Sequence, residues 1–171
     1  MSTKKEKQKI ASPGIFSDER WRKLFGVLCV LMAMYLIIAF VSYLYTWKYD
    51  QDKVIHFTWS SFFQKDLVVE NWLGRLGAFI SNAFFYYGFG VPSIVFIVLL
   101  LRLGVDLLKK NSLRSFAILT RNLIAGMAFF SLFFEFVFRK SNFTWGGAFG
   151  ESLCFWLTNF VGTIGLFLLL M

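Results

Sequence analysis

Residues 24–47 read LFGVLCVLMAMYLIIAFVSYLYTW, a run of 24 residues without a charge. At about 1.5 Å per helical residue the run reaches about 36 Å, enough to cross a hydrocarbon core of about 30 Å. Trp21 before it and Tyr43, Tyr45 and Trp47 at its end are aromatic residues typical of the two membrane interfaces. A cleavable signal peptide has a shorter apolar core and a small-residue cleavage site, so the run predicts a permanent span.

The composition of the whole chain agrees with this prediction. Of its 171 residues, 57% are hydrophobic, 20% are aromatic and only 16% are charged, and the mean hydropathy is +0.62. A soluble domain carries about 25% charged residues, which excludes that class. The 23 Phe and 2 Pro exclude a disordered or collagen-like chain. The length suits one domain, and we expect an all-α membrane protein.

Three further apolar stretches predict three more spans. The second begins after Gly88 and Gly90 with Pro92 in its first turn, and the fourth begins near Val161. Because the last stretch ends at Met171 without a polar flank, we expect the chain to be truncated within span 4. The alternative is that residues 152–171 form a 20-residue span by themselves. The predicted segments are a basic tail (1–23), span 1 (24–47), an outer loop (48–87), span 2 (88–108), a connector (109–115), span 3 (116–138), a second outer loop (139–160) and span 4 (161–171).

The distribution of charge predicts the orientation of these spans. Residues 1–23 carry seven basic and three acidic side chains, and residues 102–121 carry five basic side chains against Asp106 alone, so each region has a net charge of +4. Residues 48–75 carry four of each sign. Because Lys and Arg collect on the cytoplasmic side of a membrane, both ends of the chain are predicted to lie inside. The +8 net charge is therefore interpreted as a topology signal, not as a nucleic-acid site.

Each outer loop also contains a helical pattern with a narrow apolar face. Over 72–87 and 149–160 large apolar residues recur at helical spacing, while small or polar residues occupy the other faces. This pattern predicts two amphipathic helices lying in the outer interface. The glycines repeat as well: Gly74, Gly77 and Gly88 in the first copy match Gly147, Gly150 and Gly162 in the second. We infer an internal repeat in which a span, an interfacial helix, a glycine and a returning span follow one another.

The sequence offers little for catalysis. His56 is the only histidine and lies in a polar loop, which excludes a histidine-based metal site within the chain. No glycine precedes a lysine, so the phosphate-binding pattern G-x-x-x-x-G-K-[ST] is absent. Cys29 and Cys154 lie in apolar stretches and are interpreted as small buried hydrophobic residues.

Four charged residues lie within or at the ends of the predicted spans. Glu135 and Arg139 have the spacing and order of a favourable ion pair at the outer end of span 3. Arg102 and Arg121 are expected to extend toward the inner surface. Intramembrane charges are also candidates for function. The alternative hypothesis is therefore a small channel or transporter subunit that uses Glu135 and Arg121.

Two glycine-containing segments carry a family resemblance. Residues 71–79 read NWLGRLGAF and lead to FGVP at 89–92, and residues 146–150 read GGAFG before Gly162. Together they resemble the N-terminal four-span membrane domain of the FtsK/SpoIIIE family of bacterial DNA translocases, over roughly residues 20–171. The candidate structural or partner-binding residues are Asn71, Gly74, Gly77, Gly88, Gly90, Pro92, Gly146, Gly147, Gly150 and Gly162.

The resemblance implies a function that the residues alone do not show. Members anchor a cytoplasmic ring-shaped ATPase in the inner membrane at the division septum, where it pumps DNA during chromosome partition. The chain would then be a multi-pass anchor that contacts lipid and division proteins and is not itself an enzyme. ATP, Mg²⁺, DNA and the contacts that form a homo-oligomer would belong to the motor, which is missing from these 171 residues.

Overall fold

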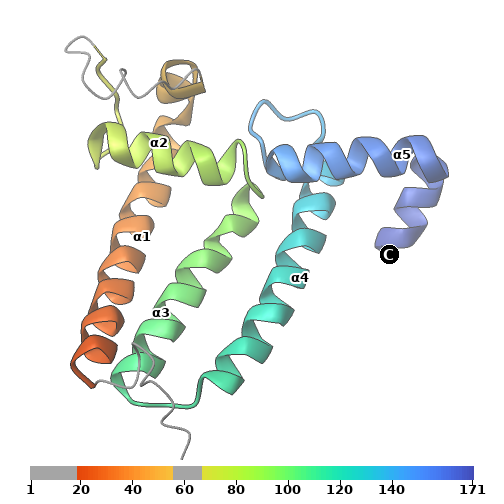
Figure 1. The fold of residues 1–171 in the computed structure, drawn as a ribbon. Helices are drawn as coiled ribbons and strands as arrows, with labels where there is room; N and C mark the ends of the chain where they lie inside the picture. The colour runs from red at the N-terminus through yellow and green to blue at the C-terminus, as the bar shows by residue number, and fades with distance from the viewer. Residues whose placement is uncertain (1–18, 56–66) are drawn as a thin grey trace, which may run out of the picture.

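The computed structural model describes residues 19–55 and 67–171, and every regular element in them is helical (Figure 1). The basic residues of the tail up to position 18 and His56 lie outside the described residues. The elements in chain order are α1 (Glu19–Ile55), α2 (Gly74–Phe85), the short 3₁₀ helix η3 (Val91–Ile94), α3 (Val95–Leu108), α4 (Leu113–Phe138) and α5 (Gly147–Leu170).

Four of these helices are long and apolar enough to cross a membrane. They are α1, the continuous helix formed by η3 and α3, α4, and α5. This result confirms the prediction of an all-α membrane protein with four spanning helices. The orientation with both ends inside, and the interfacial position of the two amphipathic segments, stay predictions.

Helix α1 extends well beyond the predicted span 24–47. It contains 37 residues from Glu19 to Ile55 and is therefore about 55 Å long. Residues 48–55 contain neither glycine nor proline, so nothing in the local sequence stops the helix after the apolar run ends. The added turns carry charged residues past both ends of a hydrocarbon core of about 30 Å.

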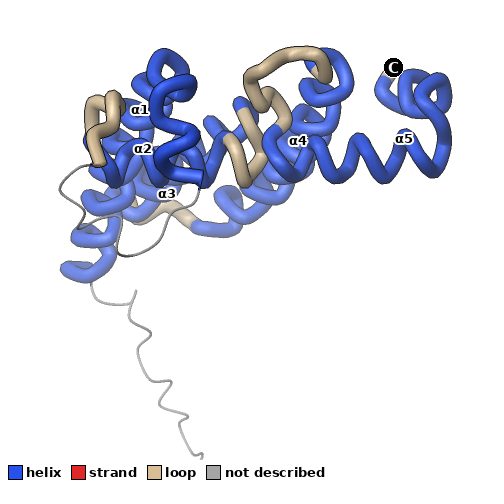
Figure 2. Tube along the Cα trace, turned by 90° about the horizontal axis from the view of Figure 1, so that it is seen from above, coloured by secondary structure: helices blue, strands red, loops and turns tan. Residues whose placement is uncertain are grey.

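Helices α1, α3 and α4 stand side by side, while α2 and the first part of α5 lie across them at one end (Figure 1). Seen along the upright helices, α5 runs away from the group formed by α1, α2 and α3 (Figure 2). We call the end formed by α2 and residues 147–161 the platform. The predicted amphipathic segments 72–87 and 149–160 both lie in it.

The main core lies between α1, α2 and α3. Ala33, Ala39 and Phe40 of α1 are buried there against Phe85 of α2. Small residues also bring α1 and α3 close together, since a Cβ added to Gly26 would lie 3.1 Å from the backbone oxygen of Gly104. Tyr43, which was predicted to lie at the interface, is instead buried in this core, because α2 covers it.

Helix α5 changes direction at Gly162, whose φ of 75° and ψ of 165° are not helical. The residues after the break pack back on α4, where Leu166 is buried beside Leu132 and Cys154. A straight helix over residues 152–171 is therefore not formed.

The glycines with positive φ support the internal repeat and correct one of its pairs. Gly74 and Gly147 both have φ +64° and each begins a platform helix, whereas Gly90 and Gly162 have φ +70° and +75° and follow one. The residue that matches Gly162 in conformation is thus Gly90 and not Gly88. Residues with a side chain rarely adopt a positive φ, so both copies use glycine where the chain turns.

The predicted orientation can be measured with reporter fusions. A reporter inserted after Lys110 is expected to be cytoplasmic, and one inserted after Asp52 to be outside, because the basic end of the bundle stays in the cytoplasm. Alkaline phosphatase and green fluorescent protein fusions at both positions provide the readout. A cytoplasmic Asp52 reporter would reject the orientation.

Candidate functional site

The two halves of the chain meet at the platform through their backbones. The backbone N–H of Val91 donates to the oxygen of Trp145 (2.9 Å). The N–H of Ala148 donates to Tyr86 (2.8 Å) and that of Phe149 to Gly88 (3.1 Å). Residues 86–91 therefore pair with residues 145–149. We call this contact the glycine junction.

Glycine is required at this junction for steric reasons. A Cβ on Gly90 would overlap the carbonyl group of Trp145, and a Cβ on Gly147 would overlap the carbonyl oxygen of Gly88. Both residues also have positive φ, which a side chain would strain. The helix η3 begins directly after the junction, and Pro92 is buried in its first turn. Proline suits this position because the first N–H groups of a helix have no partner within it.

Ser131 of α4 holds the start of α5 from below. Its hydroxyl donates to the backbone oxygen of Gly146 and lies against Gly150, where a Cβ would come within 2.8 Å of the hydroxyl oxygen. Ser131 is fully buried and is the only polar residue in the phenylalanine-rich run 123–134 of this helix. A single serine in such a run is the sequence signal that could have identified it.

Asn71 holds the first platform helix against α1. Its Nδ2 donates to the backbone oxygen of Ala39 (3.2 Å), and its Oδ1 accepts from the N–H of Leu73 (3.1 Å). Gly77 lies directly beside this amide, where a Cβ would overlap Asn71 Oδ1. Two serines complete the contact, since Ser42 accepts from the N–H of Trp72 and Ser81 donates to Ala39.

The opposite end of the bundle contains a buried carboxylate that the sequence analysis did not single out. Asp106 is fully buried, and it accepts from Nε of Arg102 (2.9 Å) and Nδ2 of Asn111 (2.8 Å). Arg22 of α1 donates to the backbone oxygens of Asp106 (3.3 Å) and Asn111 (2.7 Å). Arg102 is therefore paired with Asp106, one helical turn further along α3, and its extension toward the inner membrane surface stays a prediction.

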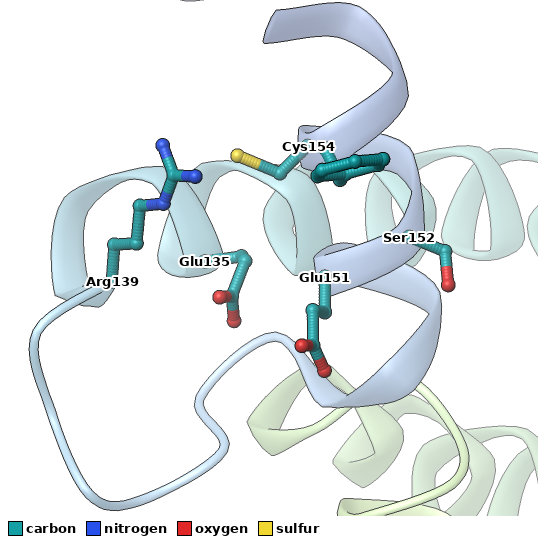
Figure 3. A pocket seen from close by; sticks show the side chains of 6 residues that line it. Glu135, Arg139, Glu151, Ser152 and Cys154 are labelled. Carbon is teal, nitrogen blue, oxygen red and sulfur yellow. The ribbon is translucent and has the colours of Figure 1, made fainter. Parts of the chain in front are cut away.

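The remaining charged candidates do not form one site. Arg121 is exposed and lies 14 positions from Glu135 on the same helix, a separation of about 21 Å. Glu135 and Arg139 do not form the expected ion pair, since no N···O distance between them is within 4.0 Å. Their side chains instead border a cavity between α4 and α5 (Figure 3).

The structure thus brings together most of the predicted glycines and Asn71, at two contacts of the platform. Gly88, Gly90, Gly146 and Gly147 lie in or beside the glycine junction, and Gly77 lies at the Asn71 contact. Gly74 and Gly162 have open space around the position of a Cβ and act through their backbone angles alone.

One comparison with known proteins gives a match. The model of the family described as the 4TM region of DNA translocase FtsK/SpoIIIE matches residues 18–171. The chain belongs to this family. It is a multi-pass inner-membrane protein and the membrane-anchoring region of an FtsK/SpoIIIE translocase. Comparisons with curated proteins and with solved structures gave no match.

The contacts described above all lie in the membrane region of the translocase. The 171 residues contain no motor domain, and the junction is built from backbone amides and carbonyls with no catalytic group among them. The junction acts through close packing of two backbone segments and holds the two halves of the chain in a fixed arrangement.

Proposed function

We propose that this chain targets its translocase to the division septum and contacts division proteins through the platform. The observation that supports this proposal is the family match over residues 18–171. In the proposed assembly the motor that the family joins to this region binds ATP, Mg²⁺ and DNA, and forms the homo-oligomer. The membrane helices hold that motor at the septum.

The platform offers a surface that suits a protein partner. Trp72 is 65% exposed and its ring stacks on Tyr45 of α1 at 6.5 Å. On α5, Trp156 and Phe160 are 59% and 74% exposed and their rings are nearly parallel at 5.3 Å. Exposed aromatic side chains, tryptophan above all, contribute strongly to binding when a partner covers them.

The rigid contacts beneath this surface support the same proposal. The glycine junction fixes α5 relative to α2, and the Asn71 contact fixes α2 relative to α1. A surface held by backbone contacts loses little conformational entropy when it binds, which favours recognition. The chain therefore presents its two aromatic pairs in one arrangement.

The proposal is tested by septal localisation of the full-length translocase carrying a fluorescent tag. A double Trp72→Ala and Trp156→Ala variant is expected to reduce the septal signal several-fold, because a tryptophan at a binding hot spot contributes about 2 kcal/mol or more. The matched control is Ile118→Ala, an exposed apolar residue on α4 that is not part of the platform. Membrane fractionation measures whether the variants insert normally.

Two outcomes would reject the proposal. Septal localisation of the double variant at the parental level would show that the platform aromatics do not recruit partners. An equal loss in the Ile118→Ala control would show that the effect is not specific to the platform.

A further inference from the structure

A charged cavity lies between α4 and α5, beside the contact at Gly146. Its volume is about 550 Å³, within the range of pockets that hold small molecules. Glu135 and Arg139 leave α4, while Glu151 and Cys154 leave α5 across from them (Figure 3). Ser152 and Phe155 complete its lining.

The charges in this cavity are not paired with one another. Within residues 19–55 and 67–171, the ion pairs join Glu19 to Lys23 and Lys110, and Asp106 to Arg102. Glu135, Arg139 and Glu151 thus have no opposite charge within 4.0 Å, although Glu135 and Arg139 are one helical turn apart. Glu135 accepts a backbone hydrogen bond from Gly146, but two carboxylates and a guanidinium line the cavity without an ion pair and suit a ligand that carries both signs of charge.

Two further pockets lie along α4 and share lining residues with the cavity or with each other. Arg139 borders both the cavity and a second pocket of about 400 Å³, which also contains Lys140, Phe136 and Val137. Phe136 and Val137 in turn border a third pocket of about 310 Å³. That pocket is lined by apolar residues of α4 and of the last turns of α5, namely Phe133, Phe136, Val137, Phe167, Leu170 and Met171. The first of these three pockets is charged and the last is apolar. A phospholipid has the same division, with a charged headgroup and apolar acyl chains.

We propose that this site binds a phospholipid with a phosphoethanolamine headgroup. Arg139 and Lys140 bind the phosphate, since a guanidinium can donate two parallel hydrogen bonds to its oxygens. Glu135 and Glu151 accept hydrogen bonds from the primary ammonium group, and an acyl chain lies along Phe136 and Val137. The inference does not depend on septal targeting.

The charges that line the cavity favour this headgroup over others. An anionic glycerol headgroup carries a phosphate for Arg139 and Lys140 but no positive group for Glu135 and Glu151. A choline headgroup has a quaternary nitrogen without N–H groups, so it cannot donate to Glu135 or Glu151. A zwitterion with a primary ammonium provides a partner for all four charged side chains.

Native mass spectrometry of the full chain in detergent tests the proposal. The probes are phosphatidylethanolamine, phosphatidylcholine and phosphatidylglycerol with identical acyl chains, added one at a time. The parent chain is expected to retain one phosphatidylethanolamine molecule at activation energies that release the other two lipids. In a Glu135→Gln and Glu151→Gln double variant the retained fraction is expected to fall about tenfold, because charged hydrogen bonds are lost.

The controls separate this site from general lipid contact. Arg121→Gln removes an exposed charge on the same helix and is expected to leave retention unchanged. Circular dichroism checks that each variant keeps its helical content. Equal retention of the three lipids by the parent chain, or preferred retention of phosphatidylglycerol, overturns the proposal without reference to any variant. An unchanged preference in the correctly folded double variant also overturns it.

Discussion

A Gly90→Ala variant is expected to lose about 4–6 kcal/mol of unfolding free energy. The added Cβ would overlap the carbonyl group of Trp145, so residues 86–91 and 145–149 would have to separate. The positive φ of Gly90 contributes about 1–3 kcal/mol of strain. Each of the three backbone hydrogen bonds lost contributes about 1 kcal/mol more.

The measurement is unfolding of the purified chain in mixed micelles, followed by circular dichroism. Gly126→Ala is the matched control, because a Cβ at Gly126 meets no atom within 4 Å and the residue lies inside α4. Alanine favours a helix over glycine, so this control is expected to be neutral or slightly more stable. If Gly90→Ala and Gly126→Ala unfolded alike, the glycine junction would not hold the two halves together.

An Asp106→Ala variant is expected to lose about 2–3 kcal/mol. The change removes a fully buried carboxylate and leaves Nδ2 of Asn111 and Nε of Arg102 without their acceptor. Arg102 is 45% exposed, so water replaces part of the hydrogen bonding that its guanidinium loses. The loss of unfolding free energy therefore stays below that for a fully buried ion pair. Most of the loss comes from the connector at Asn111, which would detach from the ends of α1 and α3.

Asp52→Ala is the control for this second experiment, because Asp52 is an exposed carboxylate near the other end of α1. We expect it to change the unfolding free energy by no more than about 0.5 kcal/mol. Asp106→Asn keeps an oxygen acceptor for Asn111 and should fall between the two. Stability of Asp106→Ala equal to that of Asp52→Ala would show that the buried cluster contributes nothing.

The sequence predicted the helices better than their contacts. Its apolar runs located the four spanning helices, and the glycine spacing indicated the break at Gly162. The expected Glu135–Arg139 ion pair was wrong: Arg139 lies just past the last residue of α4, and Glu135 instead accepts a backbone hydrogen bond from Gly146. Asp106 entered the sequence analysis only as one negative charge in a basic connector, although it is the buried centre of that end of the bundle.

The sequence by itself determined that this chain is an α-helical membrane protein of four apolar helices. Hydropathy and run length are properties of a continuous stretch, and the bilayer leaves a stretch such as residues 24–47 only the helical conformation. Only the tertiary structure decided which backbone carbonyls and amides meet at the glycine junction, since residues 86–91 are far from residues 145–149 in the chain. Such contacts depend on the approach of two backbones, and no pattern within either segment contains that information.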